Sequence, residues 1–192
     1  MKKITFLLLI LILGISFTIA FCEGAPKAKG RVILFISEQN IAGPERAWWA
    51  GEVDLSTIEI KVAQSLQSAG YEVMQPSNLS EVIKEDKAFR IIDLSLEKTL
   101  KLGNLSGADY VVLGKAIASC VRSVPQSNMQ SCNANVSGKL IRANDGEVVS
   151  YLEASGVSVH LDEISGGREA LGAAGKVLAE KVIEALDMEG DR

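Results

Sequence analysis

The chain of 192 residues has little histidine, cysteine, proline or aromatic content: one His, three Cys, four Pro and 5% Phe, Trp and Tyr. The single imidazole, His160, excludes mechanisms that need two histidines. Lys and Arg number 20 against 24 Asp and Glu, so the chain also lacks the cationic surface that binds nucleic acid. One long hydrophobic run is present, at the N-terminus, and no later segment approaches the roughly 20 apolar residues of a membrane span.

The N-terminal run has the features of an export signal. A Met-Lys-Lys start precedes residues 4–20, which are almost wholly apolar, and small residues then follow. We expect a signal peptide over residues 1–24 that is cleaved after Cys22 or Gly24. The sequence therefore predicts an exported, periplasmic protein.

Lipidation of Cys22 is the alternative, and it would associate the protein with the outer membrane. Lipoprotein signals carry a small residue just before the modified cysteine, whereas this chain has Phe21. Simple cleavage also removes Lys2 and Lys3, which makes the mature chain more acidic than the formal charge of −4.

Cys120 and Cys132 remain as a pair once Cys22 is removed. In an oxidising compartment such a pair is expected to form a disulfide, which closes a loop between two strands. A metal site is the alternative, but two thiols and one distant histidine do not complete the four ligands that zinc usually takes.

The rest of the chain divides into a linker, one domain and a tail. Residues 25–30 form a polar linker, residues 31–187 the domain and residues 188–192 a polar tail. The domain contains strands, helices and turns in this expected order: a strand over 32–36, a loop over 37–53, a helix from 56 to 70, a strand over 71–74, a helix over 78–85, an ambiguous stretch over 89–92, a helix from 95 to about 103, a strand over 110–120, a strand over 134–140, a hairpin turn at 144–146, a strand over 148–159 and a long helix after 166–167.

This order predicts an α/β fold in a single domain. It implies a mixed sheet of about five strands, with an antiparallel hairpin half in the second part of the chain. Three to four helices pack on the sheet, and the C-terminal helix is the longest. The helix after residue 55 has the clearest signals, because Ser56 and Glu59 form an S-x-x-E capping box and Gly70 suits its C-terminal end.

No motif in the chain supplies a convincing catalytic set. Ser95 and Lys98 have the S-x-x-K spacing of penicillin-recognising enzymes, but the accompanying motifs are absent and Ser95 is better explained as a helix N-cap. Four glycines at the start of the last helix could approach an anion, although close helix packing explains them better; they are Gly166, Gly167, Gly172 and Gly175. We therefore expect no enzyme activity and no cofactor.

Two features could support binding. His160, Asp162 and Glu163 form a cluster capable of holding a metal, or a small ligand, although a polar loop explains them equally well. Trp48 and Trp49 are adjacent in a loop, where at least one indole could face a partner, or the loop could fold both over a sheet edge.

Three segments resemble a group of bacterial envelope proteins. They are Ser37-Glu38-Gln39-Asn40 after the first strand, Ala69-Gly70-Tyr71-Glu72-Val73 after the helix, and Gly107-Ala108-Asp109-Tyr110-Val111-Val112-Leu113-Gly114 before a later strand. The group includes the middle domain of flagellar assembly protein T, the periplasmic domain of the curli secretion protein and the lipoprotein activators of penicillin-binding proteins. Its fold is similar to the TolB N-terminal domain, and the resemblance covers residues 31–186.

The resemblance implies an envelope protein that acts by protein–protein contact, in assembly of an envelope or flagellar structure. The flagellar, curli and cell-wall roles themselves are not carried over, because the chain departs from the lipid signal and the domain content of those proteins. We predict a non-catalytic scaffold or adaptor whose partner is another envelope protein, with self-association as a second kind of contact. The expected contact residues are Glu38, Gln39, Asn40, Trp48 and Trp49; the alternative function is periplasmic binding of a metal or small ligand by the 160–163 loop.

Overall fold

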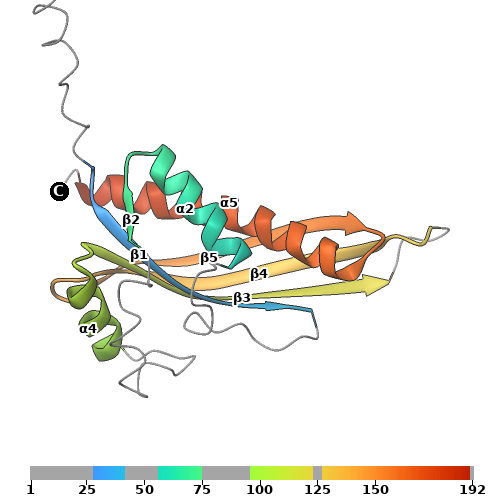
Figure 1. Ribbon diagram of the computed structural model, residues 1–192, viewed down its shortest axis with the longest axis horizontal. Coiled ribbons are helices and arrows are strands. Elements are labelled where there is room, and N and C mark those ends of the chain that lie inside the picture. The colour runs from blue at the N-terminus through green and yellow to red at the C-terminus, as the bar shows by residue number, and fades with distance from the viewer. Residues whose placement is uncertain (1–27, 42–55, 75–95, 123–126, 191–192) are drawn as a thin grey trace, which may run out of the picture.

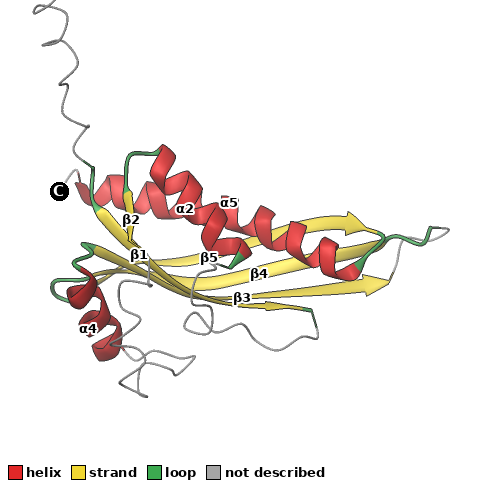
Figure 2. Cartoon of the chain, viewed as in Figure 1, coloured by secondary structure: helices red, strands yellow, loops and turns green. Residues whose placement is uncertain are grey.

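The computed structural model describes residues 28–41, 56–74, 96–122 and 127–190. The described residues form five strands and three helices (Figures 1 and 2). In chain order these are β1 (Arg31–Asn40), α2 (Thr57–Ser68), β2 (Glu72–Met74), α4 (Leu96–Ser106), β3 (Tyr110–Arg122), β4 (Gln130–Arg142), β5 (Val148–His160) and α5 (Glu163–Gly190).

The strands form one mixed sheet in the order β2-β1-β3-β4-β5. β1 is parallel to β2 and to β3, whereas β3, β4 and β5 form an antiparallel meander. Helices α2 and α5 cover one face, and α4 lies against the other face at one end (Figure 1). The predicted α/β class, the five-stranded mixed sheet and the long C-terminal helix are confirmed.

β1 is buried on both faces, which explains its continuous apolar run. Its residues at positions 32, 34 and 36 face α2 and α5, and Ile33 and Phe35 face the side of α4. A strand between two covered faces needs apolar side chains at successive positions rather than alternate ones. The larger core lies under α5 and contains Leu171, Leu178 and Leu186, each contributing about 1.5–3 kcal/mol on burial.

β1 is longer than its apolar run. The sequence predicts a loop from Ser37 onward, but residues 37–40 continue the strand and pair with residues 115–118 of β3. The ladder with β3 provides backbone hydrogen-bond partners that the local sequence does not reveal. This correction brings Glu38 into the fold.

Helix α2 begins and ends where its sequence signals predict. Ser56 Oγ accepts the N–H of Glu59 at 3.2 Å, and Glu59 Oε2 accepts the N–H of Ser56 at 2.9 Å, so the capping box is confirmed. Gly70 has φ +91°, which is the left-handed conformation expected after the helix end.

Helix α4 does not end near Gly103, as the sequence suggested. It continues to Ser106, and Gly107 takes the left-handed conformation at φ +71°. Gly103 lies inside the helix, at a position where a Cβ would stand only 2.8 Å from Val111 Cγ2. The glycine permits close packing of α4 on β3 instead of ending the helix.

The corner between α4 and β3 is fixed to the start of β1 by Asp109. Its carboxylate accepts the backbone N–H of Arg31 at 2.8 Å and pairs with the Arg31 guanidinium at 3.1 Å. The hydrogen bond from the Arg31 side chain lowers the pKa of Asp109. The Gly107–Gly114 segment is therefore a structural corner.

Helix α5 begins earlier than predicted. It starts at Glu163, so Gly166 and Gly167 lie in its first turns rather than before it. Asp162 Oδ2 accepts the N–H of Ser165 at 2.8 Å, as an N-cap does. A Cβ on Gly166 would stand 2.6 Å from Cys132 Sγ, so this glycine lets the helix approach the sheet. The helix also extends beyond residue 187, to Gly190.

Candidate interaction surface

Among the described elements, α4 alone lies against the second face of the sheet, and beyond it β3, β4 and β5 have exposed side chains on that face. Each strand has 13 residues, and exposed side chains alternate with side chains buried under α5. We call the exposed set the open face; it comprises Ile117, Ser119, Val121, Asn135, Ser137, Lys139, Tyr151, Glu153, Ser155, Val157 and Val159.

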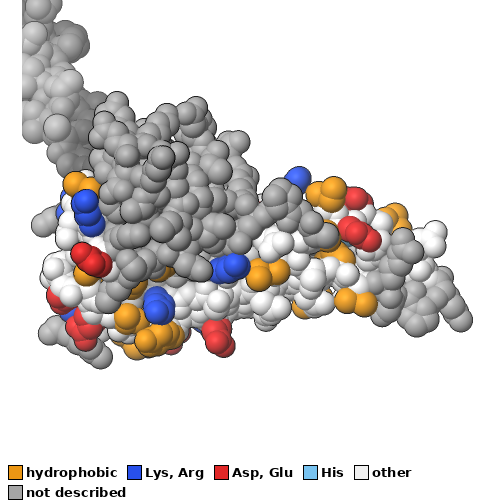
Figure 3. Space-filling view, turned by 90° about the horizontal axis from the view of Figure 1, so that it is seen from below, with side chains coloured by type: hydrophobic (Ala, Val, Ile, Leu, Met, Phe, Trp, Pro, Cys, Tyr) orange, Lys and Arg blue, Asp and Glu red, His pale blue; other side chains and the backbone are white. Residues whose placement is uncertain are grey.

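Apolar side chains of the open face lie on its two outer strands, with polar ones between them on β4. Ile117 of β3 pairs with Asn135, which pairs with Ser155. Tyr151 is 74% exposed and Val157 62%. Figure 3 views the molecule from this side, where hydrophobic and uncharged polar atoms are interspersed with few charged groups toward the hairpin end. Exposed apolar side chains that gather on one face, rather than being scattered singly, are a feature of interaction sites.

Charged groups of the open face are few and partly paired. Lys139 Nζ lies 5.7 Å from the ring centroid of Tyr151, which is within the range of a cation–π contact. A hollow of about 650 Å³ extends from Lys115 and Ile117 across Asn135 to Glu153. The surface therefore offers apolar contacts at its sides and hydrogen-bonding groups in its middle.

The predicted disulfide connects β3 and β4 at one end of the open face. Cys120 and Cys132 are directly paired across β3 and β4, with a Cα–Cα distance of 4.0 Å, and the bond is present. Closing a loop of this length restricts the unfolded chain by about 3 kcal/mol. Around this end three more apolar side chains are exposed: Met129, Leu161 and Ile164.

The predicted contact residues lie elsewhere. Glu38 is 7% exposed, and its carboxylate accepts the N–H of Ile58 at 3.0 Å, where it stabilises the start of α2. Gln39 and Asn40 are half-buried in β1, and Asn40 Nδ2 donates to the carbonyl of Ile164 at 3.2 Å. The tryptophan pair, residues 48–49, lies outside the described residues.

The loop between β5 and α5 uses its polar groups locally. His160 Nδ1 accepts the N–H of Asp162 at 3.0 Å. Hydrogen bonds from Ser165 lower the pKa of Asp162, whereas Glu163 is exposed on the first turn of α5. Among the described residues no three His, Cys, Asp or Glu side chains gather as a metal site would require. Metal binding stays a prediction from the sequence without supporting geometry.

The other candidate residues from the sequence either lie in helices of the fold or lie outside the described residues. Lys98 lies in α4, and its S-x-x-K partner, Ser95, lies outside the described residues. Gly175 packs against α2, where an added Cβ would stand 3.0 Å from Lys61 Cβ, in agreement with the packing interpretation of the glycines. No helix in the described part of the chain is long and apolar enough to cross a membrane.

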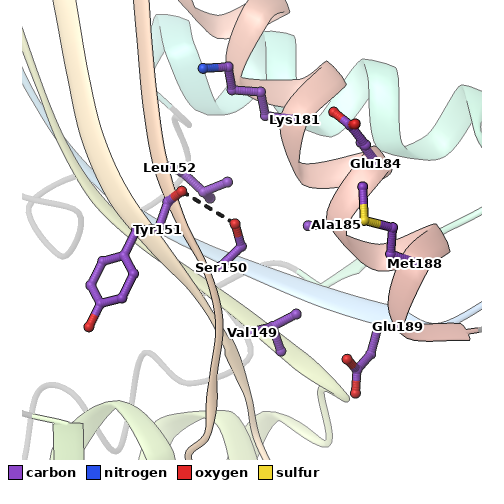
Figure 4. Close-up of a pocket in the computed structure, with 9 residues that line it drawn as sticks. All are labelled: Val149, Ser150, Tyr151, Leu152, Lys181, Glu184, Ala185, Met188 and Glu189. Atoms are coloured by element: carbon purple, nitrogen blue, oxygen red, sulfur yellow. Dashed lines mark hydrogen bonds between the residues drawn. The ribbon is translucent and has the colours of Figure 1, made fainter. Parts of the chain in front are cut away.

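A groove runs along the first half of β5, beside α5. It has a volume of about 320 Å³ and lies between Val149–Leu152 and Lys181–Glu189. In Figure 4, Tyr151 points away from α5, whereas Leu152 points toward it. The groove therefore lies on the helix side of the same strand whose other side belongs to the open face.

Sequence reasoning missed the open face, although one signal for it was present. β5 was predicted as a strand, and its buried positions, such as Leu152 and Ala154, are apolar or small. Val157 and Val159 are apolar in the opposite phase. Side chains of a strand alternate between its two faces. When only one face is covered and apolar residues occupy both odd and even positions, some of them are exposed and available for contact.

Comparison with known proteins defines the fold and leaves the family open. No family model matches the sequence, and no curated protein matches it. The structure resembles the hypothetical protein CT253 from Chlamydia trachomatis at 11% identity, with 85% of this chain and 98% of that chain covered and a TM-score of 0.51.

Two other solved structures, a lipoprotein and a C-terminal domain, are also similar to this chain. Lipoprotein GNA1162 from Neisseria meningitidis is 14% identical, with 85% of this chain and 99% of that chain covered and a TM-score of 0.47. The LpoB C-terminal domain from Salmonella enterica is 15% identical, with 73% and 87% covered and a TM-score of 0.40. At these identities the likeness concerns the fold alone.

Proposed function

We propose that this protein is an exported envelope protein that acts as a non-catalytic scaffold or adaptor, and that its open face contacts a partner protein. The observation that carries the proposal is the set of exposed aliphatic and aromatic side chains on β3 and β5, the outer strands of the antiparallel meander. Ile117, Val121 and Val157 are 44%, 58% and 62% exposed, although a strand of a soluble sheet normally presents polar residues to water.

The chemistry of the open face suits a protein partner. Apolar groups on β3 and β5 gain about 25 cal/mol for each Å² that a partner removes from water. The side chains of Asn135 and Ser137 between them offer hydrogen bonds that fix the orientation of the partner. Few charges must be desolvated, which keeps the cost of binding low.

The orientation of the domain also fits an envelope adaptor. Lys29, just before β1, pairs with Asp187 near the end of α5 at 3.2 Å. The N-terminal segment therefore enters at the end opposite the disulfide hairpin (Figure 1). A chain tethered through Cys22 would present the hairpin end and the adjoining open face away from the membrane.

Site-specific photocrosslinking in the native envelope tests the proposal. A crosslinking residue at Ile117 is expected to label one envelope protein that the same residue at Gln67, exposed on α2, does not label. The purified partner should then bind the wild-type chain at least about tenfold more tightly than Ile117→Asp, because a buried unpaired carboxylate costs more than 1.4 kcal/mol. Equal affinity for both chains would remove the open face from the proposal. Mass spectrometry of the mature N-terminus separately decides between cleavage and lipidation at Cys22.

A further inference from the structure

β5 is an edge strand, because no strand of the described sheet pairs with its outer side. It pairs with β4 through Gln130–Ile141 and has no second neighbour in the described sheet. At the other edge, β2 has only three residues. Exposed edge strands of 13 residues are uncommon, because their unpaired backbone groups are a template for another strand.

The disulfide identifies which β5 residues direct their backbone outward. A Cα–Cα distance of 4.0 Å marks Cys120 and Cys132 as a pair without mutual backbone hydrogen bonds, so Cys132 bonds toward β5 instead. Cys132 pairs with Ser158. The even-numbered residues of this part of β5 therefore bond to β4, and the odd-numbered ones, from 151 to 159, point to the free edge.

A side-chain contact leads to the same assignment. Lys181 Nζ donates to the carbonyl oxygen of Glu153 at 2.7 Å, so that carbonyl faces away from β4. Between residues 151 and 159 the other outward group with a partner in the described structure is the Tyr151 carbonyl, which accepts from Ser150 Oγ at 3.3 Å. The remaining outward N–H and C=O groups of this strand are available.

The middle of the edge is also accessible. A Cβ on Gly156 would collide with the backbone of α5 at Ala170 and Ala174, so the helix lies directly over the strand there. The α5 residues nearest Gly156 are the short Ala170, Ala173 and Ala174, and the adjacent Ser155 is exposed on the opposite face of the sheet. Toward residue 149 the groove of Figure 4 separates the strand from the helix and leaves room beside the edge.

We propose that β5 pairs in antiparallel fashion with β5 of a second copy of this chain, about a twofold axis at Ser155. The two sheets then become one continuous sheet across the dimer. Ser155 of each copy exchanges two backbone hydrogen bonds with Ser155 of the other. Glu153 pairs with Val157 of the second copy, and its carbonyl can keep Lys181 because a carbonyl oxygen has two lone pairs.

The side chains of β5 favour a second copy as the occupant. In this register Tyr151 lies opposite Val159 of the other chain, an aromatic and β-branched pair of the kind that stabilises antiparallel strands. Glu153 is the only charged residue between 151 and 159, and it lies opposite Val157 rather than another carboxylate. The pairing thus avoids the like-charge repulsion that a net acidic chain would otherwise meet in binding itself. It leaves the open face uncovered, so it is independent of the partner proposed above.

Two substitutions at Ser155 test the edge directly. Ser155→Pro removes the outward N–H without removing a bond to β4, whereas Ser155→Ala keeps that N–H and serves as the matched control. By sedimentation equilibrium the wild-type chain and Ser155→Ala should form dimers with similar dissociation constants. Ser155→Pro should dimerise about 30-fold more weakly, because both central hydrogen bonds are lost. Circular dichroism and the melting temperature at low concentration show whether the variant monomer is folded.

Cysteine crosslinking tests the register in a Cys22→Ser chain. Ser155→Cys places two thiols at the twofold axis, about 5.5 Å apart between Cα atoms, a distance that a disulfide spans. Val159→Cys places them about 26 Å apart, from eight residues at about 3.3 Å each. Mild oxidation should therefore give a covalent dimer of the first variant and not of the second. A monomeric wild-type chain, a dimer unaffected by Ser155→Pro, or equal crosslinking of the two cysteine variants would each overturn the proposal.

Discussion

Replacement of Glu59 by alanine should destabilise the fold far more than its position in a surface helix suggests. Glu59 is 4% exposed, and its two carboxylate oxygens serve different elements. Oε2 accepts the N–H of Ser56 in the capping box, and Oε1 accepts the N–H of Ile36 in β1 at 2.9 Å. β2 pairs with β1 only as far as Ile33, so the Glu59 carboxylate replaces a neighbouring strand at this point of the β1 edge.

The size of the stability loss follows from the two backbone N–H donors, of Ile36 and Ser56, that would lose their acceptor. Each buried N–H without a partner costs about 1–3 kcal/mol, so the loss of both partners in Glu59→Ala should lower the free energy of unfolding by about 2–6 kcal/mol. A typical total is about 5–15 kcal/mol, so this loss is a large share of it. Alanine has the higher helix propensity, which offsets a few tenths of a kcal/mol.

Urea denaturation followed by circular dichroism measures this difference. Gln64→Ala is the control, because Gln64 is exposed on the same helix and gains a similar propensity term. The control should change stability by less than about 0.5 kcal/mol. If Glu59→Ala also changed it by less than this amount, the bridging role of the carboxylate would be refuted.

Three further predictions concern the same core and the sheet. Burial raises the pKa of Glu59 above its ordinary value of 4.5, so the Glu59 carboxylate binds a proton more readily in the folded protein than in the unfolded chain. The stability advantage of wild type over Glu59→Gln should therefore be largest below pH 4.5 and diminish as the pH rises through the folded pKa, as denaturation at several pH values would show; a constant advantage would contradict the assignment. Gly156→Ala should cost at least about 2 kcal/mol in urea denaturation, because its Cβ meets the α5 backbone, whereas Gly190→Ala, with no atom within 4 Å, should be nearly neutral; similar effects would show that α5 shifts easily. Replacing Cys120 and Cys132 by alanine should lower stability by about 3 kcal/mol in non-reducing buffer and abolish the effect of added reductant on the melting temperature; persistence of that effect would indicate another thiol.

The sequence predicted best the features that depend on neighbouring residues. Ser56 and Glu59 identify the start of α2 because a capping box operates within four residues, and Gly70 identifies its end through backbone conformation. The strand at residues 32–36 follows from its unbroken apolar run. The pairing of Cys120 with Cys132 was predicted from their short separation and from the export expected from the N-terminal sequence.

The sequence predictions that differ from the structure share a different cause. Gly103 and Gly166 were interpreted as helix boundaries, but both lie inside helices, where they permit contact with Val111 and Cys132. A glycine has the same appearance in a sequence whether it ends a helix or permits close packing. Glu38 was expected at a partner surface and instead accepts a hydrogen bond from α2, because the strand that carries it is longer than its apolar part.

The sequence by itself determined the α/β class, the clearest helix, the core strands and the acidic, aromatic-poor character that argues against nucleic acid as a partner. Only the tertiary structure decided that α4 covers one end of its sheet face, that Val157 and Tyr151 remain exposed, and that β5 has a free edge. The physical reason is that exposure and edge position depend on strand order and register. These are set by pairing between residues distant in the chain, which local patterns do not encode.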